Sequence, residues 1–167
     1  MKKETFSYLS ITDILETINK HYGTKPALRA KREDGSFREL SYIELGNRTV
    51  DVSSALIKLG IEKEDKVAIL SENRPEWVIS FFAIISCAGI TVPIDAKLSE
   101  KEIQFILNDS EAKVIFVSKK YFSIIEGLRN VLPYLKHVIL LDDTPCNNTI
   151  LLKDLKLKEG DRKYIPV

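Results

Sequence analysis

The sequence has few glycines and lacks the glycine-rich motifs that hold nucleotide phosphates. Its 167 residues include seven glycines, and these form neither the GxGxxG pattern of a dinucleotide-binding turn nor the GxxxxGK[ST] pattern of a P-loop. Such motifs bring backbone N–H groups close to phosphate oxygens. The sequence therefore predicts no glycine-rich phosphate cradle.

Cysteine and histidine are also scarce. Cys87 and Cys146 lie far apart without CxxC or Cys/His spacing, which excludes a disulfide framework and a zinc site. His21 and His137 have no neighbouring carboxylate or serine elbow, so a structural role is favoured for both. We predict no catalytic residue and no metal site in this chain.

The sequence has almost no net charge and no long uninterrupted apolar run. The formal charge is +1, so no global field attracts nucleic acid or an anionic membrane. The most apolar stretch, WVISFFAIISCAGITVPI, is broken by Gly89 and Pro93, and the two lysines near the N-terminus have no apolar segment behind them. We expect no signal peptide, no membrane span and a cytoplasmic location.

Local signals predict an N-terminal helix, a hairpin and a second helix. Apolar residues at helical spacing indicate a helix over 12–21. Asp34-Gly35, a dipeptide suited to tight turns, predicts a β-hairpin over 27–41. Ser41 and Glu44 have the spacing of a capping box, and the helix that they open is expected to end at Gly60.

The rest of the chain alternates apolar strands with helices. Strands are predicted at 66–70, 90–94, 113–117 and 137–141, and helices from Pro75, from Ser99 with Glu102, and over 121–132. Strands without polar alternation, separated by helices, indicate a doubly wound, mainly parallel α/β sheet with helices on both faces. No helix or strand is predicted for the apolar segment at 150–155. The order of the predicted helices and strands is that of a partial domain.

Polar turns follow the predicted strands at one edge of the sheet, where open α/β folds bind ligands. Lys119 and Lys120 lie there and are candidates for a phosphate contact, although a solvated turn is the alternative. The acid pairs Asp142-Asp143 and Glu62/Glu64 are expected only to solvate the surface. Three aromatic residues of the helix from Pro75 are expected to pack in the core: Trp77, Phe81 and Phe82.

Four segments, in this order, resemble the N-terminal part of the adenylate-forming (AMP-binding) superfamily. They are LSYIEL (40–45), SENRPEW (71–77), AGITVPID (88–95) and AKVIFVSKK (112–120). Within the superfamily, the NRPEW segment is similar to acyl-CoA synthetases, including long-chain fatty acid–CoA ligases. The resemblance covers nearly the whole chain.

The resemblance implies a two-step reaction: a carboxylic acid attacks ATP to give an acyl-adenylate, and the acyl group then passes to coenzyme A. Residues 1–167 are expected to be an N-terminal subdomain fragment, because the family's phosphate loop ending in P-K-G and its later motifs are not in this sequence. ATP, Mg²⁺ and coenzyme A are thus expected for the longer enzyme, and no tightly bound cofactor for this chain, which should be inactive alone. The expected partners are the remainder of the N-terminal domain and the C-terminal domain.

Coenzyme A approaches this half of the protein in the family. The resemblance therefore makes Lys97, Ser99, Lys119 and Lys120 candidates for its phosphates. Two alternatives stay open: a free-standing binding or interaction module without catalysis, and a small nucleotide binder of the flavodoxin type. If the chain is a fragment, an uncovered apolar face is expected to cause self-association.

Overall fold

The computed structural model describes residues 10–31 and 34–156, and its N-terminal part has the predicted helix, hairpin and helix. The bounds are α1 (Ile11–Tyr22), β1 (Pro26–Lys31), β2 (Phe37–Ser41) and α2 (Tyr42–Lys58). The Ser10 hydroxyl caps α1 by accepting a hydrogen bond from the Asp13 N–H at 3.2 Å. Gly23 ends the helix with a φ of 53°, a conformation that glycine adopts without steric strain.

The predicted capping box at the start of α2 is confirmed. The Ser41 hydroxyl accepts from the Glu44 N–H at 3.3 Å, and the Glu44 carboxylate accepts from the Ser41 N–H at 2.8 Å. Leu40, directly before the cap, is buried in the core. The junction between hairpin and helix is therefore fixed by both hydrogen bonds and packing.

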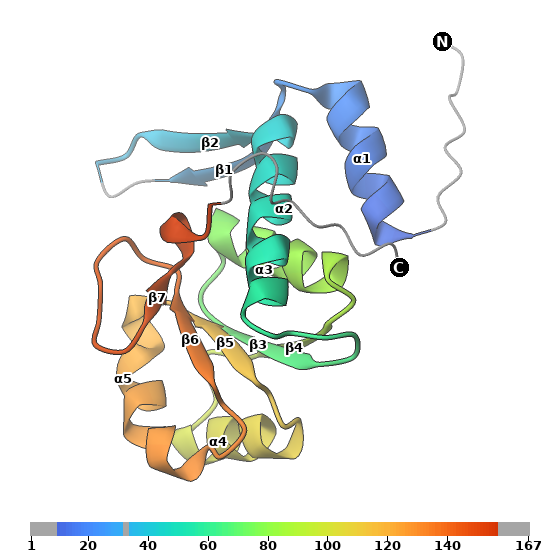
Figure 1. Ribbon diagram of the computed structural model, residues 1–167. Coiled ribbons are helices and arrows are strands. Elements are labelled where there is room, and N and C mark those ends of the chain that lie inside the picture. The colour runs from blue at the N-terminus through green and yellow to red at the C-terminus, as the bar shows by residue number, and fades with distance from the viewer. Residues whose placement is uncertain (1–9, 32–33, 157–167) are drawn as a thin grey trace.

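A five-stranded parallel sheet forms the centre of the molecule (Figure 1). Its strands lie in the order β4-β3-β5-β6-β7, and their bounds are β3 (Lys66–Leu70), β4 (Ile90–Ile94), β5 (Val114–Val117), β6 (His137–Leu140) and β7 (Ile150–Leu151). The connecting helices are α3 (Pro75–Ser86), α4 (Glu100–Asp109) and α5 (Lys119–Leu128), with short 3₁₀ turns η1 (Arg129–Val131) and η2 (Leu152–Asp154). The doubly wound α/β fold predicted from the sequence is confirmed.

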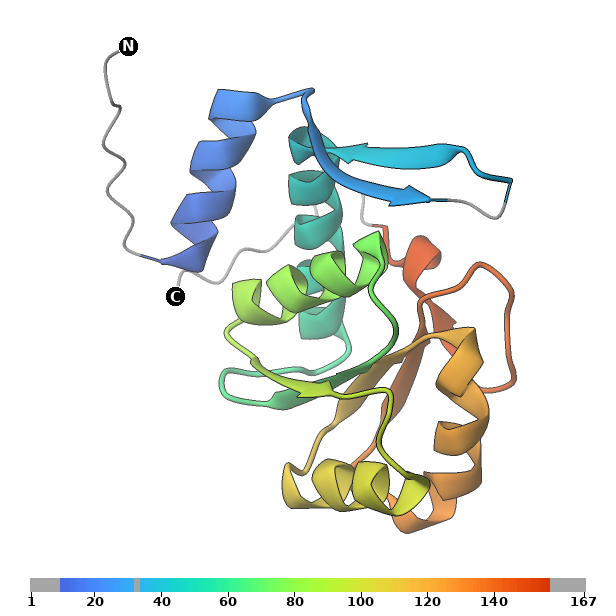
Figure 2. The ribbon, with the colours of Figure 1, turned by 180° about the vertical axis from the view of Figure 1, so that it is seen from behind.

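Each face of the sheet has its own apolar core. Val67 and Ile69 of β3 pack with α2 and α3, whereas Ala68 and Leu70 pack with α4 and α5. Figure 2 shows the two pairs of helices on opposite sides of the sheet. Since both faces are covered, the strands need no alternation of polar and apolar residues.

The strand order creates a switch point between β3 and β5. The chain first adds β4 on one side of β3 and then crosses to add β5 on the other. Counted from β3, the order is 2-1-3-4-5, which flavodoxin-like folds share. In such sheets ligands bind beyond the carboxyl ends of the strands that flank the switch point.

Two elements differ from the sequence prediction. Ile150 and Leu151 pair with Ile139 and Leu140 as a fifth parallel strand, which is too short to show a periodic pattern. Helix α5 begins at Lys119 rather than at 121, and Ser118 occupies the N-cap position. Lys119 and Lys120, which were expected to lie in a loop after β5, therefore form the start of α5.

Candidate functional site

Arg74 joins the carboxyl ends of several strands at the switch point. It is the N-cap residue of α3, which places its side chain between the turn after β3 and the end of β6. Its guanidinium donates to Glu76 at 2.9 Å, to Asp142 at 3.0 Å and to the Leu141 carbonyl at 3.4 Å, and it lies 3.5 Å from Glu72. We call these residues, together with Arg38, the Arg74 network.

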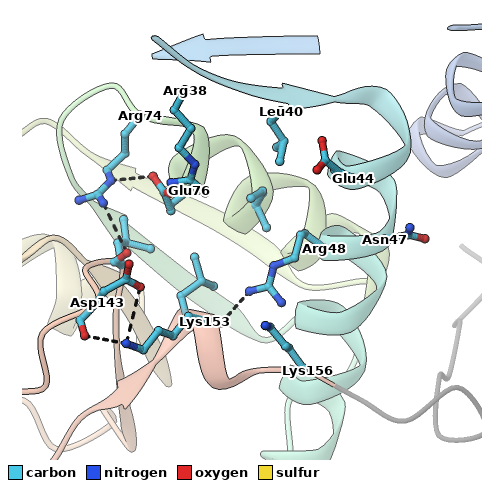
Figure 3. Close-up of a pocket in the computed structure, with 13 residues that line it drawn as sticks. Arg38, Leu40, Glu44, Asn47, Arg48, Arg74, Glu76, Asp143, Lys153 and Lys156 are labelled. Atoms are coloured by element: carbon cyan, nitrogen blue, oxygen red, sulfur yellow. Dashed lines mark hydrogen bonds and ion pairs between the residues drawn. The ribbon is translucent and has the colours of Figure 1, made fainter. Parts of the chain in front are cut away.

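The charges of the network compensate one another in a partly buried setting. Burial alone would lower the pKa of Arg74, but the hydrogen bonds to Glu76 and Asp142 outweigh it and the pKa is raised. For the carboxyl group of Glu76, burial alone would raise the pKa, but the hydrogen bond and the positive charge of Arg74 outweigh it and the pKa is lowered. Arg38 of the hairpin donates to the second Glu76 oxygen at 2.6 Å, so the network also ties β2 to α3 (Figure 3).

Asp142 has a structural role that differs from the sequence prediction. Instead of only solvating the surface, its second carboxylate oxygen accepts the Lys119 N–H at 2.6 Å and so caps the start of α5. The hydroxyl of Ser118, the formal N-cap residue, instead donates to Glu72 at 2.7 Å. The ends of β3, β5 and β6 are thus linked by side chains from each segment. Asp143, its neighbour, remains 82% exposed, as a solvating residue should.

The four candidate phosphate contacts lie at this edge in two groups. Lys97 and Ser99 follow β4, whereas Lys119 and Lys120 follow β5, and β3 lies between those strands. Ser99 is engaged in the predicted capping box, because its hydroxyl accepts from the Glu102 N–H at 3.4 Å. The side chains of the three lysines are exposed, and Lys120 lies 5.2 Å from the centre of the Tyr121 ring.

The thiol of Cys87 does not lie at this edge, because Cys87 is the C-cap residue of α3 and comes just before β4 begins. Burial raises the pKa of the Cys87 thiol to about 11, which keeps it protonated at neutral pH. Within residues 10–31 and 34–156, no group of three or more His, Cys, Asp or Glu side chains is arranged to hold a metal ion. In the same part of the chain, no helix is long and apolar enough to cross a membrane.

Comparison with known proteins decides the family. A sequence model of the AMP-binding enzyme family matches residues 15–166. The chain belongs to the AMP-binding enzyme family. Its curated relatives include 4-hydroxybutyrate–CoA ligase 2 of Metallosphaera sedula, which is 30% identical over 97% of this chain, and the crotonobetaine/carnitine–CoA ligase of Citrobacter koseri, which is 30% identical over 78% of it.

Solved structures of AMP-binding enzymes have the same fold. The crystal structure of the anthranilate CoA ligase AuaEII in complex with anthranoyl-AMP matches 89% of this chain with a TM-score of 0.80 and 31% sequence identity. The chain spans 30% and 23% of the two curated relatives and 28% of the AuaEII chain. The resemblance found in the four sequence segments is confirmed at the level of the family.

Sequence reasoning did not find the Arg74 network. Arg74 and Asp142 are 68 residues apart, and Arg38 and Glu76 are 38 apart, so no local spacing connects them. One signal was available: an arginine directly before a helix-starting proline, at the end of a buried strand, lies where polar side chains of a doubly wound sheet meet.

Proposed function

We propose that this chain is the N-terminal part of an ATP-dependent, AMP-forming carboxylic acid–CoA ligase. The observation that carries the proposal is the family match over residues 15–166, together with curated relatives that are CoA ligases. In the proposed reaction the acid attacks ATP, pyrophosphate leaves, and the thiol of coenzyme A takes the acyl group from the adenylate. We further propose a fatty acid as the substrate, on the similarity of the NRPEW segment alone, and a cytoplasmic location.

In this proposal the chain contributes cationic side chains toward coenzyme A. The ammonium groups of Lys97, Lys119 and Lys120 are exposed at the carboxyl edge, and an exposed cation suits a phosphate that must bind and leave. Ser99 is the weakest of the four candidates, because its hydroxyl is already engaged in capping α4. We propose ATP and Mg²⁺ for the longer enzyme; the described residues contain neither a glycine-rich phosphate loop nor a group of three or more His, Cys, Asp or Glu side chains that could hold a metal ion.

Titration with coenzyme A and with dephospho-coenzyme A, which lacks the 3′-phosphate, tests the lysine contacts. Replacing Lys119 and Lys120 together by methionine should weaken coenzyme A binding by about tenfold and should reduce the difference between the two ligands. Lys101→Met, an exposed lysine of α4, is the control and should leave both affinities unchanged. Equal losses in the control and the double variant would contradict the proposed contact.

We also propose that residues 1–167 alone catalyse neither half-reaction. Incubation with ATP, Mg²⁺, coenzyme A and a set of fatty acids should release no pyrophosphate above the rate without protein. Activity is expected when the chain is joined to the remaining N-terminal and C-terminal domains, its proposed partners. Formation of an acyl-adenylate by the isolated chain would contradict this part of the proposal.

A further inference from the structure

A cavity of about 470 Å³ lies beside the Arg74 network, between α2, α3, β2 and the segment around η2 (Figure 3). Sites for small molecules have volumes of roughly 300–1,000 Å³ and combine apolar walls with a few placed polar groups. The apolar part of this cavity consists of four buried side chains: Leu40, Ile79, Leu141 and Leu152. None of the four lysine and serine candidates for coenzyme A lines it.

Two partly buried arginines border the cavity, and their charges are compensated differently. Arg74 has Glu76 and Asp142 within 3.0 Å. Arg48 instead donates to the backbone carbonyls of residues 152 and 155, at 2.8 and 3.2 Å, and lies 3.7 Å from Asp51. Burial is the largest influence on the pKa of Arg48 and lowers it, whereas the pKa of Arg74 is raised. The described residues therefore neutralise Arg48 less completely than Arg74.

Lys156 adds a second cation next to Arg48. Because Arg48 binds the carbonyl of Leu155, the following residue is held close to it, and Figure 3 shows Arg48 and Lys156 reaching into the cavity from the same side. Lys153 differs, since its ammonium donates to the Asp143 carbonyl at 2.9 Å on the other side of the cavity. The Glu44 carboxylate is engaged in the capping box of α2.

We propose that this cavity binds a phosphate monoester that carries a compact apolar group. The dianionic phosphate would lie between Arg48 and Lys156, whose two charges match it, with the planar guanidinium donating to phosphate oxygens. The apolar group would lie against Leu40 and its buried neighbours and lose its contact with water. This site is separate from the coenzyme A contacts and does not depend on the proposed ligase activity.

Phenyl phosphate is the probe that tests the site, with binding followed by the backbone amide and Arg48 Nε–H resonances in NMR spectra. We expect saturable binding of one molecule with a Kd on the order of 0.1–1 mM, as for a small ligand with few heavy atoms. Inorganic phosphate and phenol, which each keep one half of the probe, should each bind about tenfold more weakly. No saturation by phenyl phosphate, or equal affinity for inorganic phosphate, would overturn the proposal.

Two lysine variants separate a defined site from general attraction of anions. Lys156→Met should weaken phenyl phosphate binding by about five- to tenfold. Lys153→Met removes the same charge from the same segment and should change the affinity by less than about twofold, because its ammonium is held at Asp143. Both side chains are exposed, so both variants should fold, which circular dichroism checks. Equal losses in the two variants would also overturn the proposal.

Discussion

Replacing Arg74 by methionine removes one of the two cations of the Arg74 network, the other being Arg38, and keeps an unbranched side chain. The substitution takes from Glu76 a hydrogen bond of 2.9 Å and from Asp142 one of 3.0 Å. Glu76 then keeps Arg38 as its remaining ion-pair partner among the described residues. Its side chain is 10% exposed, so water does little to solvate the carboxylate.

The expected destabilisation follows from leaving a partly buried carboxylate incompletely paired. Removing one partner of a buried ion pair reduces the free energy of unfolding by about 3–5 kcal/mol. Because Arg38 still reaches Glu76, we expect the lower end, about 3 kcal/mol, for Arg74→Met. In the double variant Arg74→Met/Glu76→Gln the unpaired charge is gone, so about 1–2 kcal/mol of stability should return.

Urea denaturation measures these differences, with circular dichroism as the global signal and the fluorescence of Trp77, the single tryptophan, as a local one on α3. Arg29→Met is the matched control: it breaks an ion pair with Glu39 in which the arginine is 60% exposed, and it should change stability by less than about 0.5 kcal/mol. A loss below about 1 kcal/mol in Arg74→Met, or no recovery in the double variant, would refute the reasoning.

The pH dependence gives a second readout of the same variant. In the native protein the pKa of Glu76 is lowered, so its contribution to stability is present above the unfolded value of 4.5 and is lost as the pH falls through the folded value. Without Arg74, burial is expected to dominate and to raise that pKa, so that protonation relieves the unpaired charge. The stability deficit of Arg74→Met should therefore shrink as the pH is lowered from neutral toward 4.

Two further predictions concern packing and thiol reactivity. A Cβ atom at Gly46 would lie 1.8 Å from the side-chain amide nitrogen of Asn19, so Gly46→Ala should destabilise the protein at the α1–α2 contact by about 1–3 kcal/mol in thermal or urea unfolding. At Gly127 the nearest atom would lie 4.0 Å away, so Gly127→Ala should stabilise the protein by about 0.5–1 kcal/mol. The two substitutions should change the free energy of unfolding in opposite directions, and destabilisation by both would contradict this explanation. Cys146 should react with a thiol reagent at pH 8 in the folded protein, while Cys87, buried with a pKa of about 11, should react only after unfolding, as a time course of labelling with and without urea will show.

Local signals in the sequence predicted the elements well. The Asp34-Gly35 turn, the Ser41/Glu44 box and the Ser99/Glu102 box each act within a few residues, and the structure has a hairpin or a helix start at each. The apolar strands likewise predicted the parallel sheet, because a strand that is buried on both faces consists of consecutive apolar residues. These features require no knowledge of contacts between distant segments.

What the sequence did not reveal depends on such distant contacts. Asp142 looked like a solvating residue because its partners, Arg74 and the Lys119 N–H, become its neighbours only when β3, β5 and β6 align. Helix α5 starts earlier than periodicity indicated, since the Asp142 carboxylate satisfies the Lys119 N–H from another strand. The cavity beside Arg48 was equally hidden, because Leu152, which lines it, follows Arg48 by 104 residues.

The two hydrogen bonds from Arg48 to the carbonyls of Leu152 and Leu155 also bear on how the chain folds during synthesis. Helix α2 is complete as a sequence long before these carbonyls leave the ribosome, because they follow Arg48 by 104 and 107 residues. Contacts of such long range form late, after the local hairpin and helices. During that interval the side of α2 that later meets η2 remains open to water and to chaperones, so ribosome-bound chains ending before residue 150 should be more sensitive to protease than longer ones.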